Sequence, residues 1–90
     1  MKRFRCIVKG RVQGVWYRKH VAEAAKAAGF RGYVRNLTDG SVVAVVDTPE
    51  ESLGEFKEIL KKGSPMSQVE SIECEEIPFE EPFHEFGIIR

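Results

Sequence analysis

The sequence predicts an α+β fold in which two helices cover one face of an antiparallel sheet. In each half of the chain the apolar spacing is that of a strand, then of a helix, then of a strand again. Gly, Pro and Asn residues stand between these segments. A chain of 90 residues with 42% hydrophobic and 31% charged residues is long enough for one core. We therefore expect a single domain over residues 1–90.

The first half begins with a half-buried strand and continues into a helix. Phe4, Cys6 and Val8 alternate with more polar positions, which is the period of a strand with one buried face. Helical spacing starts at Val15, and Gly29 suits a C-terminal cap. The apolar stripe of this helix comprises Tyr17, Val21, Ala24 and Ala28.

A β-hairpin is expected after the first helix. Residues 32–35 and 42–46 favour strands, and residues 36–40 (Asn-Leu-Thr-Asp-Gly) have the composition of a turn. A second helix then starts with Thr48 as its N-cap and Glu51 completing a capping box. Its apolar face comprises Leu53, Phe56, Ile59 and Leu60.

Residues 69–77 return to strand spacing, and residues 86–89 could add a short fifth strand at an edge. The order β-α-β-β-α-β is that of a ferredoxin-like, split β-α-β sandwich. We expect its two helices to pack on one face of a four-stranded antiparallel sheet. Because unrelated functions share this architecture, function has to be inferred from a site.

The net charge is zero, with cations concentrated in the first half and carboxylates in the second. This balance argues against a non-specific nucleic-acid binder. Pairing of the first and fourth strands should set the cations of one against the carboxylates of the other. The residues concerned are Arg3, Arg5 and Lys9 against Glu73 and Glu75. Since no apolar run approaches a membrane span and no secretory signal is recognisable, we expect a cytoplasmic monomer without membrane contact.

The two cysteines, Cys6 and Cys74, are too few for a zinc cage, and buried free thiols are favoured over a disulfide. We interpret His20 and His84 as surface residues, and no metal site is expected. The residues interpreted as core aromatics are Tyr17, Phe30, Tyr33, Phe56 and Phe86.

The segment from Gly10 to Arg18 has the composition of an anion site. A glycine-bounded loop that enters a helix presents unpaired backbone N–H groups, and the positive end of the helix dipole lies behind them. Arg18 adds a planar fork of donors that suits a phosphate. On its own, the glycine spacing is more typical of an ordinary turn than of an anion site. It does not match a Walker A loop, which has one more residue between its glycines and Lys-Ser/Thr after them.

Two motifs carry a family resemblance. Residues 10–18 (Gly-Arg-Val-Gln-Gly-Val-Trp-Tyr-Arg) resemble the first acylphosphatase signature, G-R-V-Q-G-V-x-F/Y-R. Residues 32–42 resemble the second, G-F/Y/W-A/V/C-K/R-N-x-x-x-G-x-V. Gly63-Ser64-Pro65 and the ending over residues 86–90 also fit the family. Thr48 replaces the glycine that closes the second signature, and as a helix cap it is expected to leave activity intact.

The resemblance implies hydrolysis of the carboxyl-phosphate bond of a small acyl phosphate, without metal or cofactor. It implies that Arg18 and Asn36 are catalytic, the first by binding phosphate and the second by orienting the attacking water. The implied phosphate cradle comprises Arg11, Val12, Gln13, Gly14, Val15, Trp16, Tyr17 and Arg18. The chemistry agrees, because a carboxylate with a pKa near 4.3 leaves without a general acid. Phosphoryl transfer then depends mainly on positioning and charge.

Two other functions stay open. A phosphate-binding module could keep the cradle without turnover, and the intact Asn36 argues against this. A single-stranded RNA binder would use aromatic side chains on the outer sheet face. The first strand offers only Arg3, Arg5, Ile7 and Lys9 there, so this alternative is disfavoured.

Overall fold

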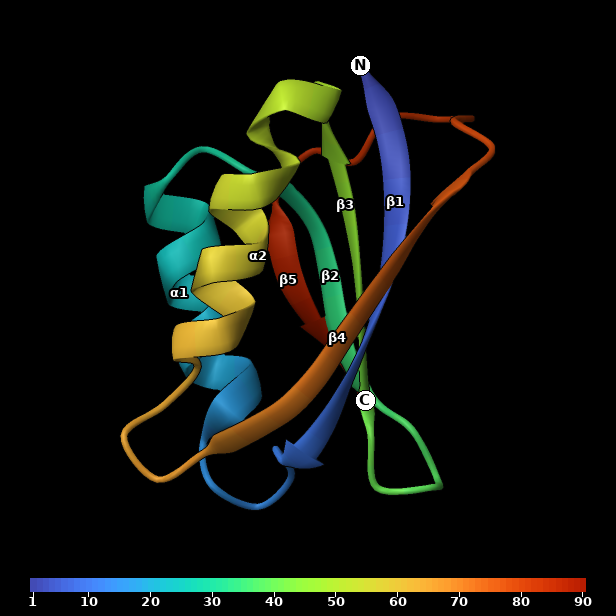
Figure 1. Cartoon of the computed structure of the whole chain (residues 1–90). Coiled ribbons are helices and arrows are strands. Elements are labelled where there is room, and N and C mark those ends of the chain that lie inside the picture. The colour runs from blue at the N-terminus through green and yellow to red at the C-terminus, as the bar shows by residue number, and fades with distance from the viewer.

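The computed structural model describes all 90 residues and has the predicted element order. Its elements are β1 (Lys2–Arg11), α1 (Tyr17–Ala27), β2 (Arg31–Asn36), β3 (Val42–Thr48), the 3-10 turn η1 (Glu50–Ser52), α2 (Leu53–Lys62), β4 (Gln68–Ile77) and β5 (Phe86–Ile89). Both helices lie on one face of the sheet, and the other face is open (Figure 1). Neither helix is long and apolar enough to cross a membrane. The ferredoxin-like α+β prediction is thus confirmed.

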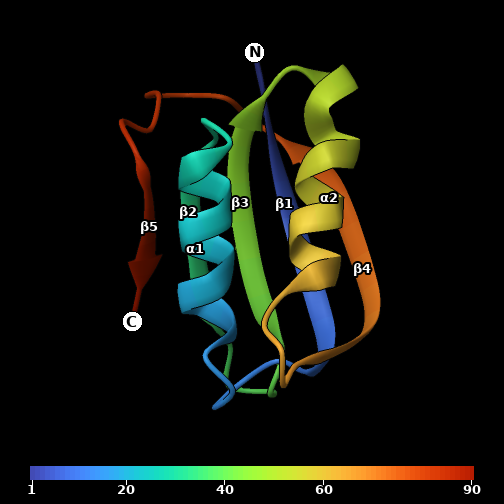
Figure 2. The same cartoon turned by 90° about the vertical axis from the view of Figure 1, so that its left-hand side faces the viewer.

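The sheet has five strands in the order β4-β1-β3-β2-β5. The first four pair antiparallel, whereas β5 runs parallel to β2 at the edge. The chain leaves β4 at one edge, crosses the end of the sheet and returns along the opposite edge as β5 (Figure 2). As a result the C-terminus lies at the same end of the sheet as the loop between β1 and α1.

The core lies between the sheet and the two helices. The rings of Phe30 and Phe56 pack edge to face there with centroids 5.3 Å apart, and Phe86 lies 5.8 Å from Phe56. Tyr33 was wrongly interpreted as a core aromatic. Val34 faces the core, so its neighbour Tyr33 points to the open face, where its ring packs on Phe83 with centroids 5.7 Å apart.

The free-thiol interpretation of the cysteines was also wrong, because Cys6 and Cys74 form a disulfide. The two residues are direct partners in the antiparallel ladder of β1 and β4, with Cα atoms 4.0 Å apart. Partners in such a ladder point to the same face of the sheet. The bond therefore follows from the strand register, which a separation of 68 residues in the sequence does not reveal.

Both helices begin later than predicted. Thr48 is the last residue of β3, fully buried, and its Oγ1 donates to the carbonyl of Pro49 at 3.1 Å instead of capping α2. A 3-10 turn precedes α2, which has no side-chain cap. The apolar stripe of α1 is rotated as well, since Ala22 and Ala25 are buried while Ala24 and Ala28 are exposed.

Only one of the ion pairs that we predicted between β1 and β4 forms. Arg5 forms an ion pair with Glu75. Arg3 instead pairs with Asp47 on β3, the other neighbour of β1, with Nε 2.6 Å from Oδ1. Glu73 lies opposite Ile7 and Lys9 opposite Ser71, so neither makes the expected cross-strand pair.

Arg3 and Asp47 are both buried and hold the crossing segment 78–85 onto the sheet. The Arg3 guanidinium donates to the carbonyl of Glu81 at 2.6 Å and lies 4.1 Å from the ring centroid of Phe83. Asp47 Oδ2 accepts a hydrogen bond from the backbone N–H of Phe83 at 3.2 Å. This cluster raises the pKa of Arg3, chiefly through the hydrogen bonds to Asp47. We call the buried pair of Arg3 and Asp47 the Arg3–Asp47 anchor.

Candidate active site

The loop from residue 12 to residue 16 joins β1 to α1 at one end of the sheet. Val12 and Val15 are buried in the core. Gly14, which lies between them, and Trp16, which follows Val15, are exposed. Both exposed residues have left-handed backbones, with φ of 71° at Gly14 and 64° at Trp16. The two valines thus hold the loop against the core. The exposed residues of the loop lead into the first turn of α1. The unpaired N–H groups of that turn make it a place for an anion.

Two side chains brace this loop against neighbouring segments. Gln13 Nε2 donates to the carbonyls of Leu37 and Ser41 at 2.7 and 2.8 Å, which ties the loop to the β2–β3 turn. Ser64 Oγ donates to the carbonyl of Val15 at 2.7 Å and ties it to the segment after α2. Sequence reasoning placed Gln13 in the cradle without finding this role. The match of Gly63-Ser64-Pro65 to the family was the only signal for Ser64.

The β2–β3 turn is itself closed by a side chain. Asp39 Oδ1 accepts hydrogen bonds from Ser41, through the hydroxyl and through the backbone N–H at 2.9 Å. These bonds lower the pKa of the Asp39 carboxyl. Since Gln13 binds Ser41 in turn, the loop and the turn form one braced unit beside the end of β2.

A cavity of about 430 Å³ lies against this unit. It is lined by Val12, Gly14, Trp16, Tyr17, Arg18, Lys19, Asn36, Ile88 and Arg90. The structure therefore brings Arg18 and Asn36 together from different elements, the first turn of α1 and the end of β2. Arg11, Gln13 and Val15 do not line the cavity: Arg11 ends β1 and points outward, and the other two hold the loop.

Asn36 carries the one buried side-chain polar atom in the molecule that has no hydrogen-bond partner, its Oδ1. Asn36 is the last residue of β2, on the same face as Val34 and thus on the helix side. Leaving a buried acceptor unpaired costs about 1–3 kcal/mol of stability. Such an atom calls for a donor from outside the protein chain, such as water or a ligand.

Arg18 is held only loosely. Its Nη1 lies 3.4 Å from the carbonyl of Ile89 in β5, and its other guanidinium donors make no hydrogen bond within the chain. They remain available for an oxyanion. Tyr17 is different: it is buried, its hydroxyl donates to the carbonyl of Leu60 at 2.7 Å, and burial raises the pKa of its phenol. Only the backbone of Tyr17 can therefore serve the site.

Three further residues line the cavity that sequence reasoning did not assign to the site. Lys19 follows Arg18 on α1, and Ile88 and Arg90 come from the C-terminal end. The parallel pairing of β5 with β2 brings these last two residues to the cavity. The ending over residues 86–90 fitted the family pattern, but nothing in its composition indicated where it lies.

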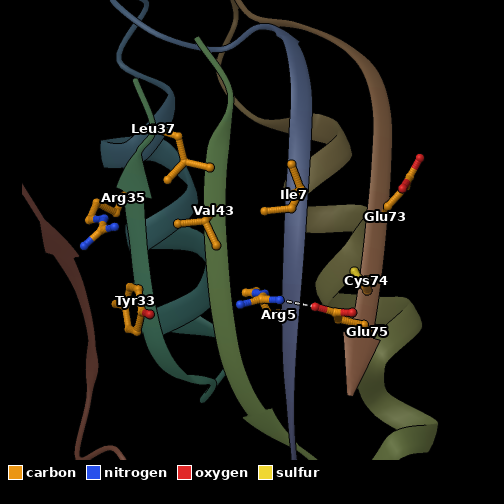
Figure 3. A pocket seen from close by; sticks show the side chains of 9 residues that line it. All are labelled: Arg5, Ile7, Tyr33, Arg35, Leu37, Val43, Glu73, Cys74 and Glu75. Carbon is orange, nitrogen blue, oxygen red and sulfur yellow. Dashed lines mark hydrogen bonds and ion pairs between the residues drawn. The ribbon is translucent and has the colours of Figure 1, made fainter. Parts of the chain in front are cut away.

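A second hollow, of about 470 Å³, lies on the open face of the sheet (Figure 3). Arg5 and Arg35 reach into it, but Glu73 and Glu75 offset their charge, and Arg5 is already paired with Glu75. Tyr33 is the one aromatic residue among its lining residues. The hollow thus has neither the aromatic platform of an RNA-binding sheet nor an excess of positive charge.

The two histidines are exposed, and His20 Nδ1 lies 2.9 Å from the carbonyl of Trp16. The surface interpretation of both is thus confirmed. No three His, Cys, Asp or Glu side chains gather closely enough to hold a metal ion.

Comparison with known proteins identifies the family. The acylphosphatase family model matches residues 4–88. The chain is 39% identical over 90 residues to an acylphosphatase of Methylococcus capsulatus, covering all of this chain and 98% of the relative. It is 45% identical over 87 residues to one of Caldivirga maquilingensis, covering 96% and 92% of the two chains. The crystal structure of acylphosphatase from Bacillus subtilis superposes with a TM-score of 0.91 at 40% identity and covers both chains completely. The chain belongs to the acylphosphatase family.

Proposed function

We propose that the protein hydrolyses small acyl phosphates to a carboxylate and inorganic phosphate in the cavity that Arg18 and Asn36 share. The observation that carries this proposal is the buried, unpaired Oδ1 of Asn36 in the same cavity as the free donors of Arg18. An anion site with an unpaired acceptor beside it provides for both reactants, a phosphate and a water molecule.

The phosphate group binds at the start of α1. Backbone N–H groups where the loop enters α1 and the positive end of the helix dipole face it, and Arg18 grips two of its oxygens. The bracing of the loop by Gln13 and Ser64 keeps these donors in place before substrate arrives. Preorganised donors of this kind stabilise charge as it develops in the transition state.

The attacking water is held by Asn36. Its Oδ1 accepts a hydrogen bond from the water and directs the water oxygen toward phosphorus, in line with the bond that breaks. The side-chain amide of Asn36 takes up no proton at neutral pH, so the water proton passes to a phosphate oxygen of the substrate. The new P–O bond comes from water, and the P–O bond to the carboxylate breaks.

The leaving group needs little help. A carboxylate has a pKa of about 4.3 and departs as an anion without being protonated. Tyr17, the nearest phenol, is buried, has a raised pKa and donates to the carbonyl of Leu60, so it takes no part. Because Arg18 and the N–H groups supply the positive charge, the reaction proceeds without a metal ion.

We further propose that the protein acts as a monomer of one domain. Both helices and all five strands contribute to one core, which supports the single domain. Sedimentation at several protein concentrations tests the monomer, and a stable dimer would contradict it.

Hydrolysis of benzoyl phosphate in EDTA tests the proposed activity. The wild type should turn over, and Asn36→Ala should lose about 100- to 1,000-fold in kcat while still binding inorganic phosphate. Arg18→Gln should lose phosphate affinity as well, measured by calorimetry. Thr38→Ala and Arg31→Gln are matched controls, because both residues are exposed and lie outside the cavity. No turnover by the wild type, or full activity in Asn36→Ala, would contradict the proposal.

A further inference from the structure

Trp16 stands out among the cavity residues in both backbone and exposure. It is the one residue other than glycine with a positive φ, 64°, and its side chain is 71% exposed. A bulky residue is disfavoured in the left-handed region, where glycine fits without steric cost. Neither backbone preference nor core packing therefore accounts for a tryptophan at this position.

The indole lies at a cavity that has two chemically different parts. Arg18, Asn36 and the loop backbone make the polar part. Trp16 and Ile88, which is 43% exposed, both supply apolar surface to the cavity, one from the loop and one from β5. Lys19 Nζ lies 5.8 Å from the centroid of the Trp16 ring, a cation–π contact that favours one orientation of the indole.

The cavity is larger than a phosphate group needs. Its volume of about 430 Å³ equals that of about 14 water molecules at ~30 Å³ each. A phosphate with five heavy atoms fills only part of this space. The remainder is space that the acyl group of a bound acyl phosphate can occupy.

We propose that Trp16 and Ile88 form an acyl-group subsite that favours acyl phosphates with an aromatic acyl group over short aliphatic ones. The proposal rests on the proposed function of the same cavity. A planar acyl group packs against the face or edge of the indole, as aromatic pairs do, and Ile88 adds apolar contact from β5. An acetyl group offers much less apolar surface for these contacts. Trp16 thus contributes its backbone to the phosphate cradle and its ring to substrate selection.

Substrate preference tests this subsite. We compare kcat/KM for benzoyl phosphate and acetyl phosphate in wild type, Trp16→Gly and Trp16→Phe. Glycine suits the left-handed backbone, so Trp16→Gly removes the ring without disturbing the loop. The benzoyl-to-acetyl ratio should fall about three- to tenfold in Trp16→Gly and be largely restored in Trp16→Phe. Ile88→Ala should lower the ratio less. Met66→Ala, a substitution of an apolar side chain that is 63% exposed away from the cavity, should not change it.

A binding experiment separates this proposal from the proposed function. Benzoylphosphonate and acetylphosphonate keep a carbonyl beside the phosphorus but have no P–O bond to a leaving group, so they bind without being hydrolysed. Calorimetry should show benzoylphosphonate binding the wild type about three- to tenfold more tightly, and Trp16→Gly should abolish this difference. Trp16 is the only tryptophan, so its fluorescence reports the same contact directly.

The outcomes are distinct. Equal affinity of the two phosphonates for the wild type, or an unchanged ratio in Trp16→Gly, overturns the subsite. An equal loss for both substrates together with weaker inorganic phosphate binding also overturns it, because Trp16 then serves only the cradle. Tighter binding of benzoylphosphonate without turnover of either substrate supports the subsite and contradicts the proposed hydrolysis.

Discussion

The two ends of the sheet differ in whether their polar side chains are hydrogen-bonded within the chain. At the end where β1 begins, the Arg3–Asp47 anchor is buried and joined to the segment 78–85 by two hydrogen bonds. At the end where β1 finishes, Asn36 Oδ1 is buried without a partner, and Arg18 makes one contact at 3.4 Å. Polar groups that are satisfied within the chain stabilise the fold. Those left unsatisfied at the other end are the groups that we propose hold water and phosphate.

The two ends are also linked, because the anchored segment leads into β5. Residues 78–85 are fixed at the anchor, and β5 then runs along β2 to place Ile88 and Arg90 at the cavity. The anchor at one end thus fixes the segment that leads to two lining residues of the cavity at the other end. Substitutions at the two ends should therefore have separable effects on stability and on activity.

The largest effect on stability is expected at the anchor. Asp47→Ala leaves the buried Arg3 without its partner, which should lower the free energy of unfolding by about 3–5 kcal/mol. Urea denaturation measures this loss. Glu75→Ala is the matched control, since its ion pair with Arg5 is exposed and should contribute about 0.2–1 kcal/mol. Equal losses in the two variants would remove the distinction between the anchor and an ordinary surface pair.

Loss of the disulfide should have the second-largest effect on stability, and it should leave activity unchanged. The bond between Cys6 and Cys74 closes a loop of 68 residues, and its loss should lower the free energy of unfolding by about 2–4 kcal/mol. The free energy of unfolding of the wild type is compared with and without reductant. The double variant Cys6→Ala/Cys74→Ala is the control, because reductant should not change its stability. Since neither cysteine lines the candidate active site, kcat/KM of the folded protein should not change. A change in kcat/KM would show that the disulfide affects the active site as well as stability.

The smallest effect is a dependence of stability on pH at the active-site end. Bonds from Ser41 lower the folded-state pKa of Asp39, so folding favours its charged form. This stabilisation is present above the ordinary value of 3.8 and is lost as pH falls through the lowered folded-state pKa. Thermal melts from neutral to acid pH should show a smaller loss in Asp39→Asn, and an intermediate one in Ser41→Ala. Identical acid profiles for Asp39→Asn and the wild type would contradict this assignment.

The sequence predicted the parts of the molecule that depend on local pattern. Period-two spacing located β1, turn composition located the β2–β3 hairpin, and the glycine-bounded loop located the connection between β1 and α1 that lines the cavity. Asn36 was found through its motif, and its place at the end of β2 explains why its side chain can face the loop.

The parts that could not be predicted depend on register and on choice of neighbour. Cys6 meets Cys74 only because β1 and β4 pair in one register, and the sequence does not state that register. β1 also has two neighbours, so charge alone did not show that Arg3 pairs with Asp47 on β3 and not with β4. The parallel return of β5, which brings Arg90 to the cavity, has no local signal at all.

The most direct test concerns Asn36, whose unpaired Oδ1 we propose serves the reaction and not the fold. In Asn36→Ala we would measure both kcat for benzoyl phosphate and the free energy of unfolding. Because the variant removes an unsatisfied buried oxygen, its stability should be equal to or above that of the wild type, while kcat falls about 100- to 1,000-fold. A variant that keeps its activity, or that loses activity only because it unfolds, would contradict the account.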